Sequence, residues 1–74
     1  SGANLVLANL SGANLEGVNV RGANLSEANL SEANLFNANL REANLKGANL
    51  WDAKIDRAIL CKTQTPWGED NSGC

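Results

Sequence analysis

The chain repeats a five-residue phrase, Ala-Asn-Leu followed by two variable residues, from Ala3 to Leu60. Between residues 23 and 45 the phrase reads ANLSEANLSEANLFNANLREANL. Twelve copies follow one another in a common register, and the first and third letters are apolar in every copy. A repeat of this regularity dictates the architecture of the chain, so its period is interpreted before any single residue.

A period of five fits neither an α-helix nor a long β-strand. Five helical residues advance about 500°, so successive leucines would lie on different sides of the helix. An odd period also sends alternate leucines to opposite faces of a strand. The pattern fits a short extended Ala-Asn-Leu segment, with Ala and Leu pointing inward and Asn outward, followed by a two-residue corner. Repetition of this unit predicts an all-β coil with an apolar inside and a polar outside.

The corner letters predict a turn of defined geometry. Glycine occupies the last letter in five places, and Asn37 occupies it once. Both residues tolerate a positive φ, which the third residue of a type II turn requires. We expect a different turn where a charged residue holds that letter, at Glu27, Glu32, Glu42, Asp52 and Arg57.

The size and composition of the chain exclude several classes of function. Seventy-four residues allow a single domain, and a net charge of −2 argues against a nucleic-acid-binding surface. The chain has no apolar run long enough to span a membrane. It contains no histidine and no tyrosine, so no Ser or Cys has the usual base beside it. We therefore predict no catalytic residue, no cofactor site and no metal site.

The phrase resembles the signature A(N/D)LXX of the pentapeptide repeat family, and the resemblance covers residues 3–60. It implies a right-handed quadrilateral β-helix, a solenoid in which four repeats form one square coil, and therefore about three coils. The tail CKTQTPWGEDNSGC is similar to the ending of cyanobacterial and thylakoid-lumen members, in which the two cysteines pair. That resemblance favours a disulfide between Cys61 and Cys74, with two free thiols as the alternative. The disulfide would place the protein in the periplasm or thylakoid lumen, and free thiols would place it in the cytoplasm.

The two ends of the repeat array carry different expectations. We assign residues 1–60 to the solenoid and residues 61–74 to a C-terminal capping tail. Trp67 is expected to cover the exposed end of the core, and the tail is expected to fold back over Ile59, an apolar residue at an outward letter. Ser1 and Gly2 match the corner letters of an earlier copy, so we expect missing upstream repeats or end-to-end association with another chain, with an unpaired end on a monomer as the third alternative.

The outward letters contain the candidate functional residues. The asparagines would form ladders in which each amide bonds its copies in the coils above and below. Phe36 and Trp51 stand on outward corner letters and form a candidate surface for an unidentified protein partner, with packing under the tail or against a neighbouring side chain as the alternative.

These patterns predict a non-catalytic structural or protein-interaction solenoid without nucleic-acid or membrane partners. The alternatives, drawn from the family resemblance and from the flat polar faces, are a DNA-mimicking type II topoisomerase-binding protein and an ice-binding surface.

Overall fold

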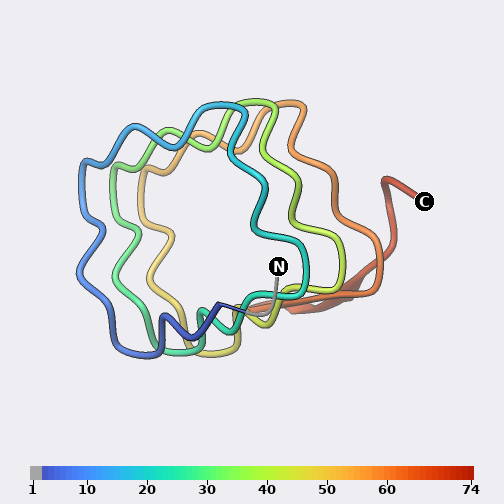
Figure 1. Cartoon of the computed structure of the whole chain (residues 1–74), viewed down its shortest axis with the longest axis horizontal. Coiled ribbons are helices and arrows are strands. Elements are labelled where there is room, and N and C mark those ends of the chain that lie inside the picture. Colours follow the sequence, from blue (N-terminus) through green and yellow to red (C-terminus); the bar gives the residue numbers. More distant parts are fainter. Residues whose placement is uncertain (1–2) are drawn as a thin grey trace.

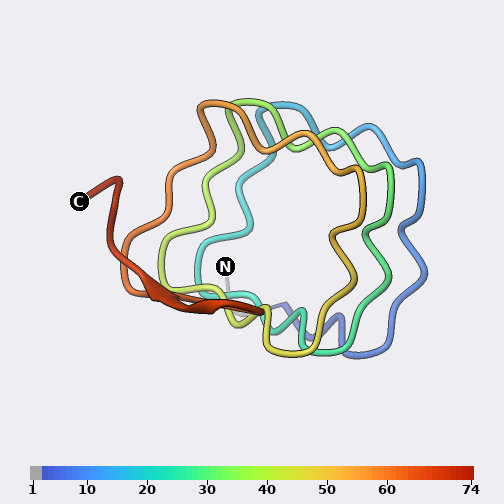
Figure 2. The ribbon, with the colours of Figure 1, turned by 180° about the vertical axis from the view of Figure 1, so that it is seen from behind.

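A computed structural model describes residues 3–74, and it shows a chain wound into stacked four-sided coils (Figures 1 and 2). Residues twenty positions apart form parallel β-bridges, from Asn4 with Asn24 to Asn44 with Gln64. Four pentapeptides therefore complete one turn of a quadrilateral β-helix. The middle residue of each extended triplet forms a bridge to the neighbouring coil, and a triplet with a coil on either side forms one bridge to each. Two continuous strands follow near the C-terminus: β1 (Thr63–Thr65) and β2 (Gly68–Asp70).

Backbone hydrogen bonds run along the axis and join each coil to the next. The Leu5 N–H donates to the Asn24 carbonyl at 2.7 Å, and the Asn24 N–H donates to the Ala3 carbonyl at 2.8 Å. The same pair of bonds recurs on the other sides of the square. These bonds satisfy the polar backbone that the extended segments would otherwise leave unpaired.

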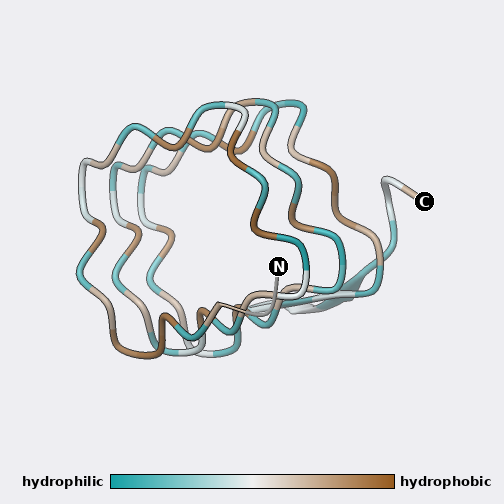
Figure 3. Ribbon diagram, in the orientation of Figure 1, coloured by the Kyte–Doolittle hydropathy of each residue, from teal (hydrophilic) through white to brown (hydrophobic). Residues whose placement is uncertain are grey.

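The core is the stack of inward alanines and leucines, and Figure 3 shows how hydrophobic and hydrophilic residues alternate along each side of the coil. Leu30 and Leu35 in the middle of the stack are 0% and 1% exposed. Leu5, Leu10 and Leu15 in the first coil are only half-buried, because no described residue packs on their outer side. The periodicity therefore identified the core residues correctly, and position along the axis sets how deeply each one is buried.

The corners contradict the prediction of two kinds of turn. The last letter has φ near +60° whether it is Gly12 (69°), Glu32 (60°) or Arg57 (61°). A bond from Ala28 N–H to the Leu25 carbonyl closes one such turn, and equivalent bonds close the others. The conformation costs an L-residue about 1–2 kcal/mol. At Glu32 the N–H donates to the Trp51 carbonyl of the next coil at 2.8 Å, a bond that depends on the same corner geometry as at the glycines.

The outward asparagines also behave differently from the prediction. Each Asn Oδ1 accepts a hydrogen bond from the backbone N–H two residues later, at 3.0–3.2 Å, in all ten asparagine-containing repeats. Asn29 Oδ1, for example, accepts from Ser31 N–H at 3.0 Å. The amide oxygen is thus bonded to its own corner, because that N–H has no axial partner and lies within reach. The asparagine is an Asx-type brace for the turn.

The coil stacking continues beyond the boundary predicted at residue 60. The Gln64 N–H donates to the Ala43 carbonyl at 3.0 Å, so β1 stacks on residues 43–45 as a further copy of the phrase. Thr63 and Thr65 take the inward positions and are buried. β2 then pairs with β1 in antiparallel register, with Thr63 opposite Asp70. The ladder therefore ends at residue 65, where the chain reverses.

The tail returns to the last coil without using Trp67 as a lid. The Trp67 indole is 58% exposed, and its Nε1–H donates to Asp70 Oδ2 at 3.2 Å. The reversal at Pro66 keeps the ring on the outside of the hairpin, so the predicted lid is wrong. The expected fold-back over Ile59 does occur through Gly73, whose N–H donates to the Leu60 carbonyl at 2.7 Å. A Cβ at Gly73 would lie 3.3 Å from Ile59 Cγ2, which shows how closely the tail approaches.

A disulfide joins Cys61 to Cys74, with their Cα atoms 4.9 Å apart. Cys61 lies at the last corner of the coil, so the bond fastens the end of the tail to the solenoid. The predictions made for Ser1 and Gly2 lie outside the described residues.

Candidate interaction surface

Trp51 is the most exposed aromatic residue of the described chain, at 68%. Its backbone is held from two directions: its N–H donates to Asn49 Oδ1 at 3.0 Å, and its carbonyl accepts from Glu32 N–H at 2.8 Å. The side chain therefore projects from a corner whose backbone is restrained. An exposed indole on a fixed backbone is the arrangement of an interface anchor, because little conformational entropy is lost when a partner contacts it.

Phe36 stands on the neighbouring corner of the square, one coil earlier, and is half-buried. Its N–H donates to Asn34 Oδ1 at 3.0 Å, and its carbonyl accepts from Gly17 N–H at 2.8 Å. Twenty residues before and after Phe36 come Glu16 and Asp56, so carboxylates flank the ring within its own column. The structure thus brings both predicted aromatics to adjacent corners, with Trp51 the more accessible of the two.

Two further exposed apolar residues lie on another corner. Val6 is 40% exposed and Leu7 is 69% exposed, and Leu7 has a φ of 63°. The sequence placed both on outward letters, yet nothing in the repeat distinguished them from other corner residues. The first coil leaves Val6 more exposed than Ser26, the residue at the same letter of the next coil, whereas Leu7 holds a corner letter that is exposed in the middle coil as well.

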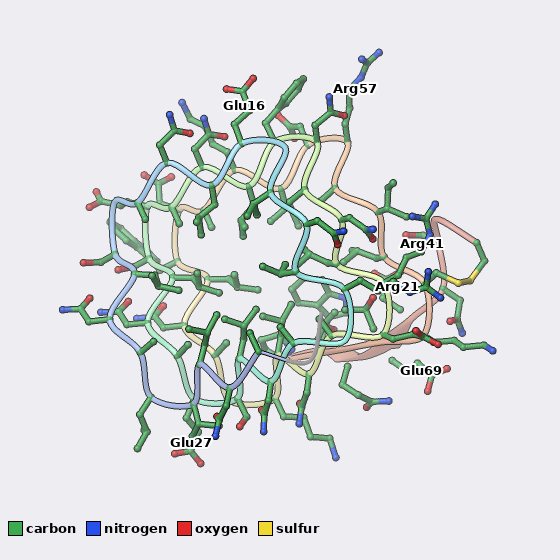
Figure 4. The ribbon with its side chains drawn as sticks, in the orientation of Figure 1. Glu16, Arg21, Glu27, Arg41, Arg57 and Glu69 are labelled. Carbon is green, nitrogen blue, oxygen red and sulfur yellow. A yellow bond between two sulfur atoms is a disulfide. The ribbon has the colours of Figure 1, made fainter. Side chains whose placement is uncertain are left out.

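The charged residues are distributed over the corners with both signs mixed, as the labelled side chains in Figure 4 show. Arg21 Nε lies 3.2 Å from Glu42 Oε1, and this is the salt bridge of residues 3–74. Both side chains are about half-exposed, so the pair contributes at most about 1 kcal/mol. The opposite corner carries Glu32 and Asp52 below and beside Trp51.

The tail contains a carboxyl group with a shifted pKa, that of Asp70. The Ser72 backbone N–H donates to Asp70 Oδ1 at 2.8 Å, and Trp67 Nε1–H donates to the other oxygen. These bonds stabilise the charged form, so the pKa of Asp70 falls below its usual value of 3.8. Through these two bonds Asp70 holds the hairpin and the tail together.

Between residues 3 and 74 the surface offers no pocket and no group of three potential metal ligands. No helix in that range is long and apolar enough to cross a membrane.

The family model for pentapeptide repeats matches residues 1–26 and 23–60, with eight copies. The chain belongs to the pentapeptide repeat family. Members of this family fold as right-handed quadrilateral β-helices and are generally non-catalytic structural or interaction proteins.

Two solved structures are similar to this pentapeptide repeat chain. Rfr23 from the cyanobacterium Cyanothece 51142 is 47% identical over 77% of the chain, with a TM-score of 0.76. HetL from the cyanobacterium Nostoc sp. strain PCC 7120, involved in heterocyst differentiation regulation, is 28% identical over 88% of the chain, with a TM-score of 0.48. The chain spans 39% of the length of the first and 41% of the second. No curated protein matches the chain at a significant level.

Proposed function

We propose that this pentapeptide repeat chain is a non-catalytic protein-interaction solenoid of about three coils, closed at its C-terminal end by the disulfide-fastened tail. The observation that carries the proposal is Trp51, whose indole is 68% exposed on a corner that hydrogen bonds with Asn49 and Glu32 hold in place. Phe36 on the adjacent corner extends the same surface.

The architecture supports this role through its rigidity. Consecutive coils are tied by main-chain bonds at every side and corner, so the outward side chains keep fixed spacings. Binding of a partner therefore orders little of the solenoid, so little backbone conformational entropy is lost. Tryptophan is among the residues that most often dominate the binding energy of an interface.

The proposed location is an oxidising compartment, the periplasm or the thylakoid lumen. The Cys61–Cys74 disulfide supports this location, because such bonds persist where thiols are not kept reduced. Intact mass of protein isolated without reductant tests it: an oxidised mass supports the location, and two free thiols would favour the cytoplasm.

A second form of association, end to end through the first coil, is also proposed. The half-buried Leu5, Leu10 and Leu15 support it, since another chain would complete their burial. Sedimentation velocity over a range of concentrations tests it, and a concentration-independent monomer would rule it out.

Affinity capture from a cyanobacterial lysate tests the protein-interaction function. We expect a partner that binds the wild-type chain and is lost with the Phe36→Ser/Trp51→Ser variant, and that binds again when purified. Trp67→Ser is the matched control, because Trp67 is nearly as exposed but lies on the hairpin. Equal capture by all three proteins would refute the role of the Phe36–Trp51 surface.

A DNA-mimicking topoisomerase inhibitor is less well supported by the surface. Such a mimic needs a continuous run of negative charge, whereas one corner column carries Arg21, Arg41 and Lys62. The described chain also measures only 27 × 22 × 20 Å.

A further inference from the structure

The C-terminal tail covers only two of the four sides of the last coil. β1 covers residues 43–45, and Gly73 covers residues 58–60, so Leu45 and Leu60 are buried at 1% and 8%. On the other two sides Leu50 and Ile55 are half-buried, whereas Leu30 and Leu35, which precede them by twenty residues, are fully buried. We call residues 48–55 the open edge. Trp51 stands at its corner.

The open edge presents a complete set of unused backbone groups. Several backbone groups of this edge have no backbone partner within residues 3–74, although the equivalent groups of other coils bond the next coil along the axis. They are the N–H groups of Leu50, Asp52 and Ile55 and the carbonyls of Ala48 and Ala53. One coil earlier the equivalent groups are all bonded, as when Leu30 N–H donates to the Asn49 carbonyl at 2.8 Å and Lys54 N–H donates to the Ala33 carbonyl at 2.9 Å. Unpaired strand edges of this kind accept an added strand.

The hairpin decides what can occupy this edge. A whole coil of a second copy would have to occupy the side where β1 and β2 already lie, so it would collide with the hairpin. A single extended segment avoids that side. Its alternate side chains would point inward, a small one over Ala48 or Ala53 and a larger apolar one over Leu50 or Ile55, since successive side chains of a strand alternate.

Trp51 supports the same site from outside. Its indole lies at the bend between the two uncovered sides, where an added segment must turn. The corner N–H of Asp52 is unpaired at the same bend, so a carbonyl of the added segment has a donor there.

We propose that the open edge binds an extended segment of a partner protein, with small and large apolar residues alternating on its inner face, by addition of a parallel strand. The inference rests on the protein-interaction function proposed above and names the chemistry of the partner. Backbone bonds supply the register, the half-buried Leu50 and Ile55 supply the apolar contact, and Trp51 packs against the bend.

A peptide made from the chain's own repeat tests this site. The probe is the acetylated and amidated peptide ANLSEANL, the sequence of residues 28–35, added to isotope-labelled oxidised protein. We expect chemical-shift changes and slowed hydrogen exchange at the amides of Leu50, Asp52 and Ile55. The same peptide with N-methyl groups on both asparagines loses the two donors to Ala48 and Ala53, so it should bind at least tenfold more weakly.

Two variants complete the design. Trp51→Ser should weaken peptide binding several-fold, and Trp67→Ser should leave it unchanged. Absence of protection at the three amides at millimolar peptide, protection confined to the first coil, or equal binding of the N-methylated peptide would each overturn the proposal. A partner captured through Phe36 and Trp51 that leaves these amides unprotected would refute the open edge while the protein-interaction function stands.

Discussion

Replacement of Leu30 by alanine tests whether the middle of the stack carries the stability of the solenoid. Leu30 is 0% exposed, with Leu10 before it and Leu50 after it in the same column. Leucine-to-alanine changes at fully buried sites cost roughly 2.7–5.0 kcal/mol, because they remove apolar contact and leave a cavity. Leu10 and Leu50 are half-buried, so Leu10→Ala and Leu50→Ala should cost roughly half as much.

The total stability makes this difference measurable. A 74-residue domain has a free energy of unfolding of about 4–11 kcal/mol at typical values per residue. Leu30→Ala should therefore remove about a quarter of it or more, and each end variant roughly half as much as Leu30→Ala. Urea unfolding followed by far-ultraviolet circular dichroism, without reductant, compares the three variants in one column. An end variant that costs as much as Leu30→Ala would refute the reasoning, because stability would then not depend on burial along the axis.

Three further predictions concern the corners, the disulfide and the tail. Gly12→Ala should lower the free energy of unfolding by about 1 kcal/mol through its φ of +69° alone, since a Cβ there meets nothing within 4 Å. Glu32→Pro should lower it by at least 3 kcal/mol, because proline cannot adopt a φ of +60°. Urea unfolding checks both variants, and an unchanged stability of Glu32→Pro would contradict the uniform corner geometry. Serine at both Cys61 and Cys74 should lower the free energy of unfolding by about 3 kcal/mol, from the loop closed across a separation of 13 residues, and an unchanged urea midpoint would contradict this. The Asp70 carboxyl, followed by NMR, should titrate below 3.8, and a titration at or above 3.8 would contradict the bond from Ser72. Because the pKa of Asp70 is lowered in the folded state, its contribution to stability is complete above pH 3.8 and is lost as the pH falls through the folded pKa.

The open edge and the capped sides illustrate how a solenoid manages its ends. Repeat proteins need terminal units that protect the last coil, because unpaired edges promote association. Here the cap is made from a short hairpin and a disulfide-fastened tail, and it reaches two sides only. The sides at residues 48–55 keep backbone groups without a partner among residues 3–74.

Much of this fold was predictable because the same five-residue pattern recurs twelve times and each copy adopts a similar local structure. The inward Ala and Leu letters, the absence of helix and the outward asparagines all follow from a period of five. The fold-back of the tail over Ile59 was also predicted correctly, since an apolar residue at an outward letter needs cover.

The wrong predictions, for the corner turns, the asparagines and Trp67, share one physical cause. In each case several hydrogen bonds or contacts compete, and the sequence alone does not show which of them is the most favourable. Glu32 prefers negative φ in isolation, but its N–H bonds the next coil only from the left-handed corner. The Asn29 amide oxygen could have bonded its copies, but it accepts a hydrogen bond from the N–H of its own corner. Trp67 is the largest apolar residue of the tail, but the turn at Pro66 and the bond to Asp70 keep its ring outside.

The candidate site was predicted only in part. Trp51 and Phe36 were identifiable as outward aromatics, but the sequence did not distinguish the exposed one from the half-buried one. The sequence also contained evidence that the ladder continues into Thr63–Thr65, because β-branched threonines stand at the inward letters in register with the repeat. The prediction missed this continuation because the residues there are no longer Ala, Asn and Leu.

The sequence by itself determined the unit: an extended triplet, a two-residue corner and a core of alternating Ala and Leu, because these depend on contacts within and between identical repeats. Only the tertiary structure decided which sides of the last coil are covered. That outcome depends on where the 14-residue segment from Cys61 to Cys74 leaves the repeat register, where it reverses and which groups it reaches. The open edge at residues 48–55 exists because the chain turns back at Pro66 before it can cover them.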